Sequence, residues 1–209
     1  MLNESDKLPA YFKTGKMKVL TYTILLISGL YVIATTGWIV TENRTILTVM
    51  ELLTIWAAIV ILLFMAELYS GCTQERKRQG LIALILTTCM AVVTISNHFI
   101  YMTVLNQLYR GAAMPDWLLL DGWPSLSKGL ECVSWAFFLG LAMLYAAKVL
   151  EELKSQAIAW TMRVFAILTL AGLAGPLLGN MNLYILSTIG YSLGFLVISI
   201  EMILYFKKN

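Results

Sequence analysis

The sequence predicts an all-α integral membrane protein, a polytopic bundle of six transmembrane helices with both termini in the cytoplasm. The prediction rests on composition, on six long apolar windows and on the placement of basic residues. Hydrophobic residues make up 59% of the 209 residues and charged residues 13%, whereas soluble globular domains have roughly 45–50% and about 25%. Lipid is therefore the expected surroundings of most of this chain.

Each apolar window is long enough to cross the hydrocarbon core of a bilayer, which takes about 20 helical residues. The expected spans cover residues 19–40, 46–69, 81–105, 126–150, 157–178 and 183–206. None has the strict alternation of a transmembrane β-strand. The expected organisation is one transmembrane domain over 19–206, preceded by a cytoplasmic segment, 1–18.

Basic residues give the expected orientation, because Lys and Arg near short loops stay on the cytoplasmic side of a membrane. With the N-terminus inside, twelve of the fifteen fall on the cytoplasmic side, and Arg44, Arg110 and Lys128 fall outside. The expected location is the plasma (inner) membrane. The net charge of +3 reflects this topology and does not indicate a nucleic-acid partner.

One outer loop, residues 106–125, is longer than the others and reads NQLYRGAAMPDWLLLDGWPS. Its Trp and Leu residues between two Asp residues are typical of a segment at the membrane interface. Two interpretations remain open for it. The loop rests on lipid, or it forms a lid over an outward-facing pocket.

Polar residues inside the spans recur at helical spacing. In the third span Thr87, Thr94, His98 and Tyr101 fall along one side of a helix, and His98 is the single histidine of the chain. Polar groups in hydrocarbon turn toward the protein interior, because an unsatisfied one costs several kcal/mol. We expect this stripe to face the centre of the bundle.

Three titratable side chains share one depth. Glu51, His98 and Glu131 lie one to two turns below the outer surface on three different helices, which predicts an outward-facing pocket between them. The candidate ligand-binding residues are Glu51, Asn97, His98, Tyr101, Glu131, Ser134 and Trp135. The structural alternative is that His98 is a hydrogen-bonded packing residue and that both carboxylates reach water near their helix ends.

A second layer of charge is expected near the inner face. Glu67, Arg163 and Glu201 could meet there, with a salt bridge between Arg163 and Glu201. Alternatively, Arg163 extends along its helix to the inner membrane surface.

Two glycine pairs predict close helix approach. Gly190 and Gly194 form a GxxxG pattern in the sixth span, and Gly175 and Gly179 form another at the end of the fifth. Pro176 is expected to kink the fifth helix or to mark its outer end.

Several chemistries are excluded by what the sequence lacks. One histidine cannot build a multi-histidine metal site or supply two haem ligands, and no HExxH, CxxC, GxSxG or phosphate-binding loop is present. Glu51, His98 and Glu131 have suitable chemistry for a metal, but three unplaced residues do not establish a site. We predict no cofactor and no metal.

Three functions remain open. The first is binding or transport of a small polar or cationic ligand through the outward pocket, with protonation of His98 coupled to binding. The second is an intramembrane enzyme that acts on a lipid-like substrate with His98 and a carboxylate as acid and base. The third is an accessory or sensor subunit, with a membrane-protein partner or a second copy of the chain, whose polar residues only join helices.

Overall fold

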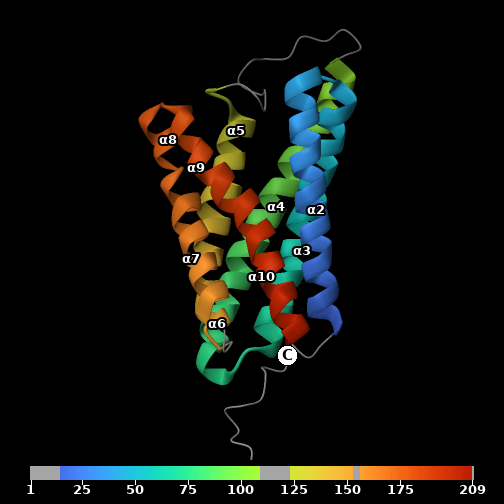
Figure 1. Ribbon diagram of the computed structural model, residues 1–209. Coiled ribbons are helices and arrows are strands. Elements are labelled where there is room, and N and C mark those ends of the chain that lie inside the picture. The colour runs from blue at the N-terminus through green and yellow to red at the C-terminus, as the bar shows by residue number, and fades with distance from the viewer. Residues whose placement is uncertain (1–14, 109–122, 153–155, 209) are drawn as a thin grey trace, which may run out of the picture.

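Figure 1 shows the computed structural model, in which residues 15–108, 123–152 and 156–208 are described. All elements in these ranges are helical. In chain order they are α2 (Gly15–Thr41), α3 (Arg44–Gly71), η2 (Gln74–Arg76), α4 (Lys77–Leu108), α5 (Leu126–Glu131), η4 (Cys132–Leu139), α6 (Gly140–Leu150), α7 (Gln156–Ala171), α8 (Ala174–Leu178), η5 (Met181–Tyr184), α9 (Ile185–Thr188), η6 (Ile189–Leu193) and α10 (Gly194–Lys208).

Six stretches are long and apolar enough to cross a membrane, as the sequence predicts. They are Gly15–Thr41, Thr45–Gly71, Gln74–Val104, Leu126–Leu150, Gln156–Leu178 and Met181–Lys208. The first and third begin before their apolar windows, because polar residues continue a helix beyond the hydrocarbon-length core. The expected segment 1–18 and loop 106–125 fall mainly on residues 1–14 and 109–122, which are outside the described ranges.

The helices form one elongated bundle (Figure 1). We call the end where α2 finishes and α3 begins the upper end, and the end holding the turns at residues 72–73 and 151–152 the lower end. Helix α2 packs on α3 and on α10, α3 packs on α4, and α4 packs on α6 and η4. Helix α7 completes the bundle by packing on α6, η6 and α10.

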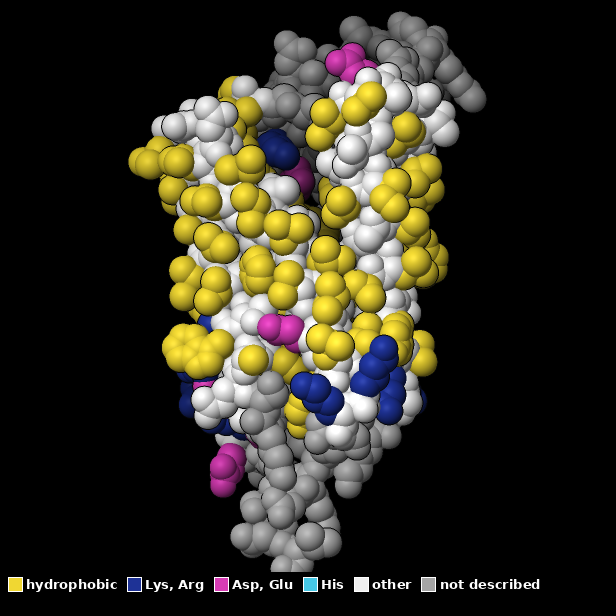
Figure 2. Space-filling model, in the orientation of Figure 1, with side chains coloured by type: hydrophobic (Ala, Val, Ile, Leu, Met, Phe, Trp, Pro, Cys, Tyr) yellow, Lys and Arg dark blue, Asp and Glu magenta, His cyan; other side chains and the backbone are white. Residues whose placement is uncertain are grey.

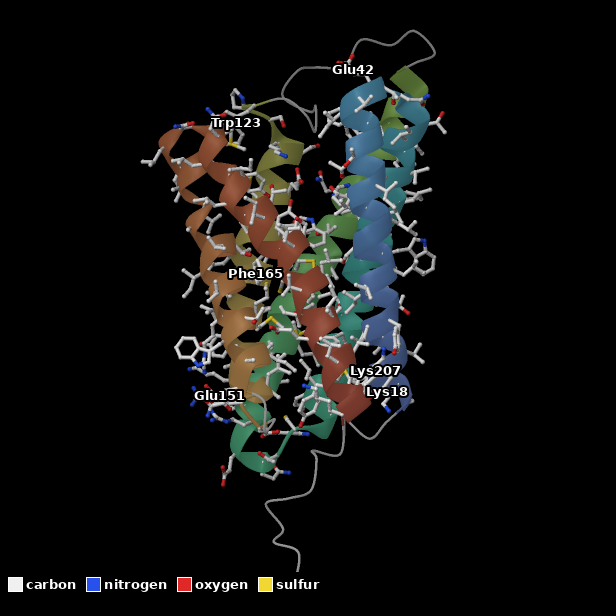
Figure 3. All side chains as sticks on the ribbon, in the orientation of Figure 1. Lys18, Glu42, Trp123, Glu151, Phe165 and Lys207 are labelled. Carbon is white, nitrogen blue, oxygen red and sulfur yellow. The ribbon has the colours of Figure 1, made fainter. Side chains whose placement is uncertain are left out.

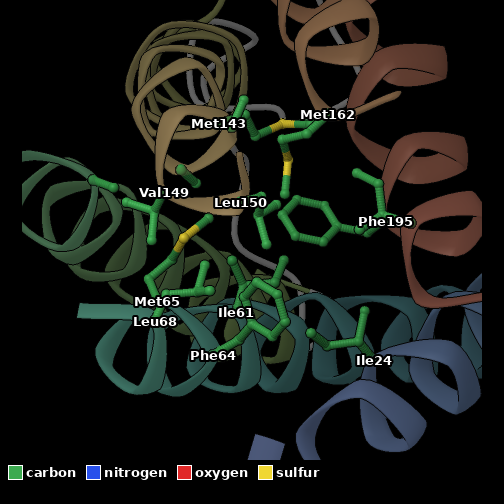
Figure 4. Packing of buried hydrophobic residues seen from close by; sticks show 14 of the residues in the cluster. Ile24, Ile61, Phe64, Met65, Leu68, Met143, Val149, Leu150, Met162 and Phe195 are labelled. Carbon is green, nitrogen blue, oxygen red and sulfur yellow. The ribbon is translucent and has the colours of Figure 1, made fainter. Parts of the chain in front are cut away.

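The best-packed part of the core lies toward the lower end, below the level of Trp135. Figure 4 shows Phe64, Met65 and Leu68 of α3 meeting Met143 and Met162 across the bundle, and all five are buried. Methionine fills irregular gaps between helices because its side chain is unbranched and flexible. By contrast α2 is peripheral, with only 6% of its most apolar window buried against 61% for Leu126–Leu150.

Small residues let α7 approach the last span closely. A Cβ added at Gly190 would lie 2.8 Å from the Cα of Thr169, and one at Gly172 would lie 2.7 Å from the Cβ of Ser187. Both distances are below any normal contact. The Ser187 hydroxyl donates to the carbonyl of Thr169 across this interface, so the close approach also satisfies buried polar groups.

The other predicted glycine pair divides into two roles. Gly175 packs closely, since a Cβ there would lie 2.8 Å from the Tyr184 amide nitrogen. Gly179 has nothing within 4 Å and instead ends α8 in the left-handed conformation, with φ of 68°, which glycine adopts without a steric penalty. Pro176 lies in the first turn of α8, after the chain has already broken at residues 172–173.

Gly190→Ala should lower the melting temperature of the purified protein by several degrees, since overpacking costs about 1–3 kcal/mol. Gly29→Ala on α2 is the matched control, because nothing lies within 4 Å of a Cβ added there and alanine favours a helix by about 0.5–1 kcal/mol. Differential scanning fluorimetry in detergent measures both. Equal melting temperatures for the two variants would contradict the close approach of α7 to η6.

Candidate functional site

A cavity lies between α2, α3, η4 and η6, nearer the upper end than the lower. It has about 510 Å³ of empty space including its open mouth, of which about 50 Å³ admits the centre of a water molecule. The latter value is enough for several waters, because one needs about 10–15 Å³ by the same measure. Its lining comprises Ile27, Ser28, Tyr31, Thr54, Ala57, Ile61, Glu131, Trp135, Tyr191, Ser192 and Phe195.

The lining changes from polar to apolar along the bundle. Tyr31, Thr54 and Glu131 lie on its upper side. On the same three helical spans, Ile27, Ile61 and Trp135 lie one turn or more farther from the upper end. The side chains of Tyr31 and Thr54 both line this part of the cavity, and Tyr31 lies within the electrostatic reach of Glu131 and Glu51. The cavity is therefore amphipathic, with its one carboxylate on the polar side.

Glu131 is held by a partner on its own helix. The ammonium of Lys128 lies 2.8 Å from Glu131 Oε2 and 5.2 Å from the centre of the Tyr184 ring. Both charged side chains remain partly exposed, at 24% for Lys128 and 14% for Glu131. Figure 2 shows basic and acidic side chains at the floor of a hollow that opens between α2 and α9. A pair of this kind is weak because water screens it.

Aromatic rings form the side of the cavity next to Glu131. The rings of Trp135 and Tyr191 have centroids 5.0 Å apart and are tilted by 36°. Tyr191 also lies within the electrostatic reach of Glu131. A carboxylate and aromatic rings in one cavity are chemically suited to a cation, which both kinds of group attract.

Both helices that supply these groups leave the α-helical pattern at the cavity. Cys132–Leu139 and Ile189–Leu193 are π-helical, and they hold Trp135 on one side and Tyr191 with Ser192 on the other. Such wide turns cost backbone hydrogen-bond energy and occur frequently at functional sites. The sequence carries no signal for them, because residue types in π-helical turns are those of ordinary helices.

Glu51 and His98 form a separate site. His98 Nδ1 contacts Glu51 Oε2, and the side chains are 4% and 6% exposed, respectively. Within the described ranges the other ring nitrogen, Nε2, has no hydrogen-bond partner. Neither residue is among those that line the cavity, although Tyr31 in the cavity wall lies within the electrostatic reach of both Glu51 and Glu131.

The remaining predicted ligand-binding residues have structural partners or are buried. Asn97 donates to the carbonyl of Ser127 at 3.1 Å and thus joins α4 to α5. The hydroxyl of Ser134 donates to the carbonyl of Glu131 at 3.0 Å within one helix, and Tyr101 is buried. Of the seven predicted residues, Glu131 and Trp135 line the cavity.

At the lower end, the ion pairs differ from the expected layer of Glu67, Arg163 and Glu201. Arg163 forms its ion pair with Glu151, which also binds Arg76 at 2.7 Å. Glu201 instead accepts a hydrogen bond of 2.9 Å from Thr161. The long Arg163 side chain follows its helix to the end of the bundle, where water lowers the cost of charge. No ion pair of Glu67 was found within the described ranges.

Sequence reasoning missed the contribution of the first span. Ser28 and Tyr31 are three residues apart on α2 and both line the cavity, followed four residues later by Thr35, a hydrogen-bond partner of Tyr31. This spacing is the same signal that identified the stripe of the third span. In the part of the chain that is described, no three His, Cys, Asp or Glu side chains lie close enough together to hold a metal ion.

Removal of one partner of the Glu51–His98 pair should cost about 3–5 kcal/mol, because it leaves the other charge buried alone. We expect Glu51→Leu and His98→Leu each to lower the melting temperature strongly. The double variant should be more stable than either single one, since two apolar side chains of similar size leave no unpaired charge.

Ser96→Ala on the same helix is the control, because Ser96 is exposed. Strictly additive losses in the double variant would show that Glu51 and His98 do not depend on each other. The measurement is thermal unfolding of the unchanged protein and these four variants in one detergent.

Comparison with known proteins adds no identification. No family model, curated protein or solved structure matches this chain. The function is therefore inferred from the side chains of the cavity themselves.

Proposed function

We propose that the chain is a multi-pass protein of the plasma (inner) membrane with its lower end in the cytoplasm. Figure 3 shows Lys18 and Lys207 at that end, with Glu42 and Trp123 at the other. Figure 2 shows basic side chains concentrated at the lower end and apolar ones along the sides. The positive-inside rule then assigns both termini to the cytoplasm and the cavity to the outer half of the bilayer.

We propose further that the cavity binds a small organic cation, an amine or a quaternary ammonium. The observation that supports this function is the Glu131 carboxylate beside the ring faces of Trp135 and Tyr191. A carboxylate provides charge, and aromatic faces add about 0.5–2 kcal/mol for a cation that has lost water. Hydroxyl groups of Tyr31 and Thr54 supply the remaining polar contacts.

Glu131 is free to change partner without loosening the bundle. Glu51, Asn97 and Glu201 each join two different helices, so replacing their partners would disturb helix packing. The partner of Glu131 is Lys128, three residues away on the same helical span. A ligand that competes with Lys128 therefore disrupts no contact between helices.

Binding is better supported than the two alternatives. Glu51 and His98 have the atoms of an acid–base pair, but both are buried and neither reaches the cavity, so a substrate there would not meet them. A purely structural role does not explain two π-helical stretches around one carboxylate. Transport would require a second arrangement, because Phe64, Met65 and Met143 fill the bundle below the cavity.

Choline should raise the melting temperature of the purified protein, and its uncharged isostere 3,3-dimethylbutan-1-ol should not. Ligand at a hundredfold excess over Kd stabilises by about 2.7 kcal/mol, which corresponds to several degrees. Glu131→Gln should abolish the difference between the two probes, because the carboxylate provides the preference for charge.

Glu67→Gln is the matched control, since it removes the same charge outside the cavity. Isothermal titration calorimetry in detergent tests whether the rise in melting temperature reflects binding of choline. Equal shifts with both probes, or an undiminished choline shift in Glu131→Gln, would contradict the proposed function.

A further inference from the structure

The cavity opens sideways, between α2 and η6. Helix α2 packs much more closely on α3 and α10 than on η6 or α9, although Ser28 of α2 and Ser192 of η6 both line the cavity. Figure 2 shows the hollow on this flank with apolar side chains on either side. The flanks carry exposed Leu30, Ile189 and Leu193, so the mouth faces the part of the bundle suited to hydrocarbon.

The charged and apolar side chains of the cavity follow one another in a fixed order along the bundle. Helix α5 begins at the upper end, so Lys128 lies about one turn above Glu131. Below Glu131 come Trp135 and Phe195, and below those the packed core begins. From the upper end inward, the order is therefore Lys128 at the rim, Glu131 in the lining, and then a mainly apolar surface that also carries the hydroxyls of Ser28 and Ser192.

We infer that the ligand is an amphiphilic amine with its ammonium attached next to an apolar tail, and with any acidic group farther from that tail. The inference rests on the proposed function and narrows its ligand class. In this orientation the ammonium contacts Glu131, an outer anionic group contacts Lys128, and the tail lies against Trp135 and Phe195. The tail reaches the site through the sideways mouth and needs no passage through water.

A phospholipid with a choline headgroup has the opposite order, since its phosphate lies between the tail and the ammonium. Its phosphate would approach Glu131 and its ammonium would approach Lys128, so that like charges meet at both positions. Because Lys128 lies above Glu131, the site favours zwitterions with the ammonium next to the tail over zwitterions with the phosphate next to the tail. The two classes carry the same net charge. Like-charge contacts are the usual means by which a site rejects a near relative.

Two octyl amphiphiles test the inference with the full chain in lipid nanodiscs. Octyl sulfobetaine has its ammonium next to the tail, and octylphosphocholine has its phosphate there. We expect octyl sulfobetaine to raise the melting temperature more, and to bind at least tenfold more tightly than its chain-free parent, dimethylammoniopropane sulfonate. Each buried methylene contributes about 0.8 kcal/mol, or roughly fourfold in affinity.

A charge-swapped variant, Lys128→Glu with Glu131→Lys, keeps the ion pair and reverses its direction. The swapped variant should favour octylphosphocholine over octyl sulfobetaine. A reversed preference requires a folded protein, so it cannot be explained by a loss of folding, which is the alternative explanation for lost binding in Glu131→Gln. Equal shifts with both amphiphiles in the unchanged protein, or no reversal in the folded swapped variant, would overturn the inference. A positive choline result alongside that outcome would leave the proposed function standing, whereas failure of choline as well would remove both.

Discussion

A polar side chain inside an apolar helical bundle has to find its partner within the protein, because water is not there to replace it. Two buried pairs of this chain satisfy that constraint by joining helices: Glu51 with His98 joins α3 to α4, and Asn97 with Ser127 joins α4 to α5. These contacts fix the rotation of each helix about its own axis. The position of every other side chain, including those of the cavity, depends on that rotation.

Glu131 departs from this pattern. Its carboxylate is partly exposed and its partner is on the same helical span, so its charge contributes little to the packing of helices. Next to it, the π-helical stretches 132–139 and 189–193 turn Trp135 and Tyr191 toward the same space. Wide helical turns and a half-buried charge both lower the stability of the folded protein, so stability alone does not explain them. A ligand that the carboxylate and the rings attract provides an explanation.

The two polar centres of the upper half therefore have different physical roles. The Glu51–His98 pair is dry and closed, and its removal affects folding first. The Glu131 cavity is open to the flank of the bundle and is bordered by α2, the least buried of the six spans. A peripheral helix can shift with little loss of packing, which suits a site that a molecule enters from the side.

Much of the fold could be predicted from the sequence, because the length of an apolar window and its flanking charges determine a helix of membrane-spanning length. Depth within a span also follows from counting residues, and Glu51, His98 and Glu131 do occupy the upper part of the bundle. The direction in which each side chain faces does not follow from depth. Glu51 and His98 lie on neighbouring helices and pair with each other, while Glu131 pairs with Lys128 and lines the cavity.

Long side chains and backbone irregularities limit the prediction further. Arg163 extends to Glu151 at the end of the bundle instead of meeting Glu201 at its own level. The π-helical turns 132–139 and 189–193 also depart from ordinary helical spacing, which a count along the sequence assumes throughout. Tyr31 was missed because the high average hydropathy of its span concealed the short polar stripe that contains it.

Infrared difference spectroscopy of the protein with and without tetramethylammonium observes the central carboxylate directly. If Glu131 contacts the bound cation, the difference spectrum should contain a perturbed carboxylate band that disappears in Glu131→Gln and persists in Glu67→Gln. A spectrum without a carboxylate change, or one that is identical in Glu131→Gln, would contradict the assignment of Glu131 as the group that binds the cation.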